Sequence, residues 1–192
     1  MTTPPPISYF AYGSNMLRER LLDRHVLLLD NGQAAQVIDY DLVFNKKSDD
    51  HSSKANLMPA TGTTSWGVLF SVNSTSLEGL DAAEGAPAHY CRASVIVRIP
   101  DAELQAMTYL AQPHKLLTGR DCPWDWYLAL IIAGAKACPN MPVEWIQHIR
   151  AIGSPKQSSS PSKSSLRAAA QLKSASYDNW PQLLEKPNES TL

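Results

Sequence analysis

The order of apolar and polar residues predicts several strands followed by helices. Apolar and polar side chains alternate at 40–44, 66–72 and 92–99, which is the pattern of a half-buried strand. Further strands are expected at 7–12 and 105–111. Helical spacing is found in three segments, at 15–25, 124–137 and 142–152. Strands that precede a run of helices predict an α+β fold rather than a regular series of β-α-β units. In the first helix we expect Leu17, Leu21 and Leu22 to face the core.

The last fifth of the chain has a different composition. From 154 to 165, seven of twelve residues are serine and no large apolar side chain occurs. Such a stretch buries too little apolar surface to offset the entropy lost on ordering, so a flexible linker is expected. Beyond it, a short helix at 166–172 and a few apolar residues can dock only loosely: Tyr177, Trp180, Leu183 and Leu184. The predicted organisation is a domain at 1–153 and a serine-rich linker and tail at 154–192.

Composition excludes several classes of protein. The chain has 192 residues, 44% of them hydrophobic, and a formal net charge of -1, which suits one domain without a general basic surface for nucleic acid. No apolar run is long enough to span a membrane, and residues 1–7 lack the pattern of a signal peptide. The three cysteines are widely spaced, which argues against a disulfide framework and favours a reduced, cytoplasmic setting.

A turn between the first strand and the first helix is a candidate binding element. The segment Tyr9–Asn15 (YFAYGSN) passes from apolar residues directly into Gly13, Ser14 and Asn15. Gly13 allows a tight turn and close approach of a ligand, and Ser14 or Asn15 can cap the helix. The N–H groups at such a helix start suit a carboxylate or an oxygen that gains negative charge. The alternative is an ordinary corner between strand and helix.

A short helix ends in a carboxylate that is a candidate acid/base. Leu77, Leu80 and Glu84 lie at i, i+3 and i+7, so Glu84 falls on the apolar stripe of the helix. Gly85 is typical of a helix end, and Pro87 prevents the helix from continuing. A carboxylate on a buried stripe is costly unless it is paired or needed, and a needed one suits a general base. The alternative is a solvated side chain in a fraying last turn.

Other polar residues are weaker candidates. Tyr90 and Tyr127 can each lend a hydroxyl group to a pocket, although a core position is the commoner role. His89 can line a site with Glu84, but a surface position is favoured. A solvent-exposed loop is expected to carry the charged cluster Lys46, Lys47, Asp49 and Asp50.

Several common catalytic motifs are absent from the sequence. Without G-x-S-x-G, Ser14 is a poor candidate for a hydrolase nucleophile. The sequence has no Walker loop and no dinucleotide fingerprint. The five histidines show no metal-ligand spacing, so no metal site is expected.

A series of segments occurs in an order that is specific for one family. They are YFAYGSN at 9–15, ANLMPATGTTSWGVLF at 55–70, LEGLDAAEG at 77–85, Tyr90, TYL at 108–110, YLALIIAGAK at 127–136 and AIG at 151–153. In these segments, over about residues 7–153, the chain resembles the γ-glutamylcyclotransferase family. The YGSN loop alone would be weak evidence, whereas the loop with a downstream LDxxEG and tyrosine is specific. The serine-rich tail has no counterpart.

The resemblance implies a small mixed β-barrel flanked by helices. It implies a cofactor-free enzyme, a lyase or acyltransferase of glutathione metabolism, that releases 5-oxoproline from γ-glutamyl compounds. Because the loop reads YGSN and not YGSL, γ-glutamyl-amino acids or γ-glutamylamines are favoured over glutathione. Glu84 corresponds to the family's acid/base. The implied substrate-binding residues are Tyr9, Phe10, Ala11, Tyr12, Gly13, Ser14, Asn15, Tyr90 and Tyr127.

In the implied mechanism, Glu84 takes a proton from the substrate's α-ammonium group. The freed amine attacks the γ-carbonyl of the same molecule, the loop holds the oxyanion, and Glu84 returns the proton to the departing amine. The expected partners are a small-molecule γ-glutamyl substrate and, at most, a second copy in a homodimer, with neither nucleic acid nor membrane. Two alternatives stay open: a tailoring enzyme that removes γ-glutamyl groups from larger acylated amines, and a non-catalytic small-ligand binding domain.

Overall fold

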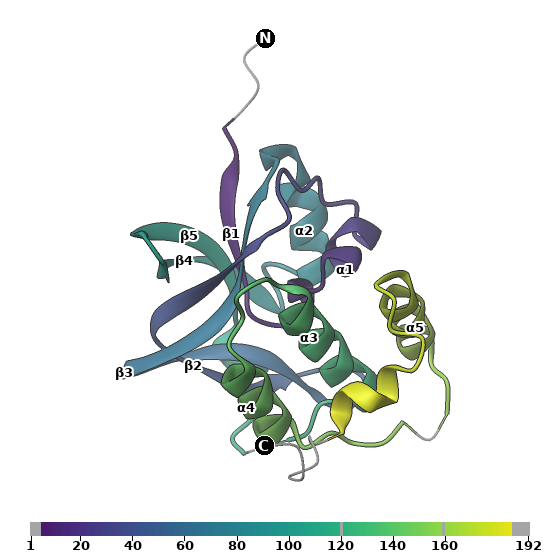
Figure 1. Ribbon diagram of the computed structural model, residues 1–192. Coiled ribbons are helices and arrows are strands. Elements are labelled where there is room, and N and C mark those ends of the chain that lie inside the picture. Colours follow the sequence, from purple (N-terminus) through teal and green to yellow (C-terminus); the bar gives the residue numbers. More distant parts are fainter. Residues whose placement is uncertain (1–4, 120, 159, 186–192) are drawn as a thin grey trace.

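Five strands close into a barrel in the computed structural model, which describes residues 5–119, 121–158 and 160–185 (Figure 1). The order around the barrel is β1-β3-β2-β4-β5. The first strand pairs antiparallel with β3 and parallel with β5, so the sheet is mixed. The predicted α+β class and the barrel implied by the resemblance are confirmed. The strands are β1 (Ile7–Ala11), β2 (Gln33–Lys47), β3 (Ser53–Val72), β4 (Tyr90–Ile99) and β5 (Ala102–Ala111).

The hairpin of β2 and β3 is much longer than the alternating segments predicted. The part of β3 near the turn of the hairpin contains Pro59 and Gly62, two residue types that are unfavourable inside a strand. Pro59 lies opposite Tyr40, next to a shift in the register of β2 and β3. Asp39, the residue of β2 just before Tyr40, has a left-handed φ of 60°. Irregular positions of this kind are where a strand tolerates proline.

One buried helix, α3 (Asp125–Ala137), packs against the loop that follows β1. Every residue of α3 from Asp125 to Ala135 is buried. A Cβ atom on Gly134 would lie 2.3 Å from the backbone nitrogen of Leu17, so the absence of a side chain lets α3 approach this closely. The helices predicted at 124–137 and 142–152 are confirmed, the second as α4 (Val143–Gly153), which follows Pro142.

The predicted helix at 15–25 is split in two. A 3₁₀ turn, η1 (Ser14–Met16), is followed by an extended Leu17 and then by α1 (Arg18–Asp23). Leu17 and Leu21 are fully buried, as expected, but Leu22 is 42% exposed, so its predicted inward position is wrong. Adjacent helical residues point about 100° apart, and a six-residue helix covers only one narrow face.

The short helix that carries Glu84 is α2 (Leu77–Glu84), preceded by a 3₁₀ turn, η2 (Ser74–Ser76). Leu80 is fully buried, and Gly85 ends the helix with a left-handed φ of 64°. Another 3₁₀ turn, η3 (Pro113–Lys115), follows β5. No helix in the described ranges is long and apolar enough to cross a membrane.

The C-terminal segment is packed more closely than expected. It forms α5 (Lys163–Ser174), which contacts α1 and α3, and a 3₁₀ turn, η4 (Trp180–Leu184), which contacts α3 (Figure 1). Ala168 and Leu172 of α5 are fully buried, and Leu183 is buried as well. The predicted helix at 166–172 is confirmed, but its docking is not loose, because its apolar residues lie one turn apart and share one face.

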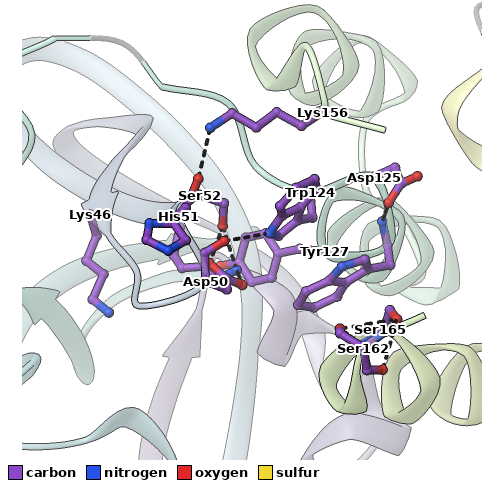
Figure 2. A network of polar contacts seen from close by, with 12 residues as sticks. Lys46, Asp50, His51, Ser52, Trp124, Asp125, Tyr127, Lys156, Ser162 and Ser165 are labelled. Atoms are coloured by element: carbon purple, nitrogen blue, oxygen red, sulfur yellow. Dashed lines mark hydrogen bonds and ion pairs between the residues drawn. The ribbon is translucent and has the colours of Figure 1, made fainter. Parts of the chain in front are cut away.

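Part of the serine-rich segment is also held by the core. The backbone N–H of Lys156 donates to the oxygen of Pro123 at 2.8 Å, and its Nζ donates to the backbone oxygen of His51 at 2.9 Å (Figure 2). Ser162 and Ser165 form a capping box that starts α5. These contacts differ from the flexible linker expected. Residues 159 and 186–192 of the predicted tail lie outside the described residues, and independent folding of 1–153 stays a prediction.

The packing of α5 predicts that the C-terminal segment stabilises the domain. Leu172→Ala should lower Tm by on the order of 10 °C, because it removes a fully buried side chain and leaves a cavity. Removal of everything after Gly153 should lower Tm at least as much. Thermal unfolding followed by circular dichroism measures both effects.

The matched control is Leu166→Ala on the same helix, where the side chain is 61% exposed and little change is expected. Equal melting temperatures for the two leucine variants and the parent protein would show that α5 does not dock in solution.

Candidate active site

The carboxylate of Glu84 is held at the C-terminal end of α2 by residues that follow β1 and α1. Asn15 donates from Nδ2 to Glu84 Oε1 at 2.9 Å and to the hydroxyl oxygen of Tyr9 at 2.8 Å. Arg24, which follows α1, forms an ion pair with Glu84 and donates to Asn15 Oδ1 at 2.8 Å. The Glu84 side chain is 16% exposed. It is therefore largely buried and paired, not solvated in a fraying turn.

Arg24 is a site residue that the sequence analysis missed. Burial by itself would lower the pKa of Arg24, but the facing carboxylate of Glu84 outweighs it and the pKa is raised. The guanidinium group therefore stays charged and neutralises Glu84 in the absence of a ligand. Nothing in the spacing of residues 15–25 distinguishes Arg24 from the other basic residues there, because its partner lies 60 positions away.

Most of the predicted site residues surround one small pocket beside Glu84. Its volume is about 30 Å³, roughly the share of one water molecule in the liquid. The predicted residues that line it are Tyr9, Tyr12, Gly13, Asn15, Glu84, Tyr90 and Tyr127. Ala55 and Tyr109 line it too and were not anticipated. Phe10, Ala11 and Ser14 are buried but do not line it.

Three tyrosines of the pocket are fixed by hydrogen bonds to backbone groups. Tyr12 donates to the oxygen of Tyr109 at 2.6 Å, and Tyr90 donates to the oxygen of Ala55 at 2.9 Å. The N–H of Ala55 donates to the hydroxyl oxygen of Tyr127 at 3.2 Å. Burial, reinforced by nearby Glu84, raises the pKa of Tyr9, and burial raises that of Tyr127. Both therefore stay protonated, and neither hydroxyl donates to an acceptor within the described ranges.

The loop at Gly13 is more than a corner between strand and helix. A Cβ atom on Gly13 would lie 3.3 Å from the Cβ of Ala55 and 3.5 Å from the hydroxyl oxygen of Tyr127, inside the pocket. The N–H groups of Ser14 and Asn15 have no acceptor in the part of the chain that the structure describes. The side chain of Asn15 holds Glu84, so the loop that carries these unsatisfied donors adjoins the carboxylate, an arrangement that can bind an oxyanion and move a proton.

A wider cleft adjoins the pocket on the other side of Glu84. Its volume is about 290 Å³, and it shares Glu84, Tyr90 and Tyr127 with the pocket. Lys46 and His89 line this cleft. The expectation that Lys46 lies in an exposed loop is wrong: it belongs to β2 and is 5% exposed. His89 likewise faces the cleft and is not simply a surface histidine.

The largest cavity lies elsewhere. It measures about 560 Å³ between β2 and α4 and contains none of the predicted site residues. The small pocket is the better candidate, since it joins a held carboxylate, two residues of the loop and several tyrosine hydroxyls at one place. Among the described residues, no three His, Cys, Asp or Glu side chains come together as a metal site.

The fold and the pocket define a barrel protein in which one largely buried carboxylate, that of Glu84, is held against the loop at Gly13. The family model described as "Gamma-glutamyl cyclotransferase, AIG2-like" matches residues 9–127, and the chain belongs to this family. The match includes the loop at Gly13, Glu84 and Tyr127.

Curated relatives and solved structures agree with this assignment. The human γ-glutamylcyclotransferase is 30% identical over 156 residues, which cover 75% of this chain and 77% of the relative. The bovine γ-glutamylcyclotransferase is 28% identical over 151 residues, with the same coverage of each chain. A solved structure named γ-glutamyl cyclotransferase has a TM-score of 0.72 and 26% identity, and covers 86% of this chain and 99% of its own.

The pairing of Glu84 with Arg24 predicts an effect on stability. Glu84→Gln should lower the free energy of unfolding by about 1–3 kcal/mol, because a largely buried guanidinium group loses its counter-charge. Removing Arg24 as well, in Glu84→Gln/Arg24→Gln, should cost less than the sum of the two single changes. Urea unfolding measures all three variants.

Glu78→Gln is the matched control, since Glu78 lies on the same helix and is exposed. Additive effects of the two site substitutions would mean that Glu84 and Arg24 do not interact in solution.

Proposed function

We propose that this protein is a γ-glutamylcyclotransferase, which cyclises the γ-glutamyl group of its substrate, releasing 5-oxoproline and a free amine. The observation that carries the proposal is the carboxylate of Glu84, held against the YGSN loop in a pocket lined by tyrosines. Family membership and the human relative's name support the same reaction.

The first step is binding of the γ-glutamyl group with its α-ammonium at Glu84. Arg24 and Asn15 occupy the carboxylate in the unliganded protein, so the substrate's ammonium competes with the guanidinium for Glu84. The pocket by itself is too small for the group, and part of the substrate therefore extends into the adjoining cleft. Tyr9 and Tyr127 offer hydroxyl protons to the substrate's oxygens.

Ring closure follows when Glu84 takes a proton from the α-ammonium. The freed amine attacks the γ-carbonyl carbon, a C–N bond forms, and the oxygen becomes an oxyanion held by the N–H groups of Ser14 and Asn15. As the carbonyl re-forms, the bond to the departing nitrogen breaks. Glu84 delivers its proton to that nitrogen. It then takes the second proton from the ring nitrogen and passes it to the freed amine, which leaves as an ammonium, so the protein ends in its starting state.

The reaction requires neither a cofactor nor a covalent nucleophile, because attacker and target belong to the same molecule. Holding the chain folded for ring closure supplies a large share of the acceleration. We expect a place in glutathione metabolism and a cytoplasmic location, consistent with a small γ-glutamyl substrate.

A second candidate is removal of γ-glutamyl groups from a larger acylated amine. It is favoured by the space beyond the pocket, where the cleft of about 290 Å³ continues into another of about 330 Å³ that shares Arg20, Lys54 and Tyr127 with it. The chemistry at Glu84 is the same in both cases, and only the size of the departing amine differs.

A substrate panel tests the proposal. The protein is incubated with γ-glutamyl-alanine, γ-glutamyl-glutamate, glutathione and γ-glutamyl-ε-lysine, and 5-oxoproline is measured by chromatography. We expect one 5-oxoproline for each amine released, with glutathione the poorer substrate. Release of free glutamate in place of 5-oxoproline would indicate hydrolysis, and no turnover of any member would indicate a binding domain.

Gly13→Val should abolish turnover of γ-glutamyl-alanine, since the new side chain fills the space between Ala55 and Tyr127. Gly119→Val is the control, because a Cβ atom there meets nothing within 4 Å. The two variants are compared by kcat/KM after their melting temperatures are shown to match the parent's. Parental turnover by Gly13→Val would show that this loop is not part of the substrate site.

A further inference from the structure

The cleft on the far side of Glu84 holds more cations than its carboxylates neutralise. Lys54 pairs with Asp50 at 2.7 Å, and Arg24 pairs with Glu84. Arg20 and Lys46 line the same cleft, and neither forms an ion pair with a carboxylate of the described residues. Asp49 also lines the cleft and attracts Lys46 without forming an ion pair with it. At their formal charges, four cations there (Arg20, Arg24, Lys46 and Lys54) face three carboxylates (Asp49, Asp50 and Glu84), so the cleft keeps a net positive charge.

Arg20 is held by the C-terminal helix and not by an anion. Its Nη1 donates to Oε1 of Gln171 on α5 at 2.9 Å. Its Nε is buried and has no acceptor among the residues that the structure describes. Burial and the neighbouring Arg24 lower the pKa of Arg20 to about 9. The Arg20 guanidinium group, with a buried Nε that lacks an acceptor, therefore has a donor available for an anion.

Lys46 lies near the end of β2, where every second residue is buried. Leu42, Phe44 and Lys46 are buried and Lys47 is exposed, so the alternation of the strand places the Lys46 side chain in the cleft. Its Nζ lies 3.2 Å from Nδ1 of His89 and 5.2 Å from the ring centre of Tyr90. Burial and the nearby ammonium lower the pKa of His89, so this partner is neutral at pH 7.

We propose that Arg20 and Lys46 form an anion-binding subsite for the departing half of the substrate, and that the favoured leaving group is an acidic amino acid with two carboxylates. The inference rests on the proposed cyclisation. Glu84, Tyr90 and Tyr127 border both the pocket and the cleft, which puts the scissile bond at their boundary and the departing amine among the cations. Gln171 is a positioning residue, and through it the C-terminal segment influences which leaving group is accepted.

The test compares three substrates that share the γ-glutamyl group and differ in the departing amine: γ-glutamyl-glutamate, γ-glutamyl-alanine and γ-glutamyl-alaninamide, with two, one and no carboxylates. For the parent protein we expect kcat/KM to fall in that order. Each lost charge-assisted contact should cost roughly 10- to 100-fold.

Variants assign the effect to residues. Lys46→Gln and Arg20→Gln should each reduce the ratio of kcat/KM for γ-glutamyl-glutamate over the amide by about tenfold or more. Lys47→Gln should leave the ratio unchanged. Arg20→Lys should restore part of it, and Gln171→Leu should lower it without abolishing turnover of the amide.

The outcomes separate the two claims. Turnover of all three substrates at equal kcat/KM, or an unchanged ratio in Lys46→Gln and Arg20→Gln, would overturn the anion subsite and leave the cyclisation standing. Absence of 5-oxoproline from every substrate would instead overturn the proposed function.

Discussion

The hydrogen bonds of the Asn15 side chain connect the two halves of the candidate site. One amide group donates to Tyr9 on the first strand and to Glu84 at the end of α2, and its oxygen accepts from Arg24. Asn15 can make all three hydrogen bonds because α3 packs against its loop and fixes the position of the loop. Gly134 lets that helix come so close that a Cβ atom would collide with the backbone at Leu17. Core packing thus fixes the loop, and the loop fixes the carboxylate.

The electrostatics of the site depend on the same arrangement. Arg24 balances Glu84 while no ligand is bound, and the tyrosine hydroxyls stay neutral because they are buried. On the far side of Glu84 the cations outnumber the carboxylates, and the hydrogen-bond partners of Arg20 and Lys46 are the neutral side chains of Gln171 and His89. The site therefore has a polar, nearly neutral pocket for one half of a ligand and a positive cleft for the other.

Much of this arrangement could be predicted from local patterns. The alternating strands, α3 and the short helix that ends in Glu84 depend on neighbours in sequence. The stripe of Leu77 and Leu80 placed Glu84 on the apolar side of its helix but left open whether the carboxylate is buried or solvated. The position of Tyr127 at the start of a buried helix followed from the same periodicity.

The rest could not be predicted, because it depends on partners far apart in the chain. Arg24 meets Glu84 across 60 positions, and Arg20 meets Gln171 across 151. Lys46 is buried because β2 extends into the polar, charged segment that was expected to form a loop. The docking of α5 was missed because the serine-rich segment that precedes it has the composition of a linker. Ala168 and Leu172 of α5 nevertheless share one buried face.

The central claim is that the Glu84 carboxylate moves the proton, in addition to its contact with the substrate's α-ammonium. The most direct measurement compares parent and Glu84→Gln in a single turnover of γ-glutamyl-glutamate, with the dissociation constant measured separately by calorimetry. The account predicts that the rate of 5-oxoproline formation at saturating substrate falls by roughly 10² to 10⁴, a much larger factor than the rise in the dissociation constant. A near-normal rate in Glu84→Gln would contradict it.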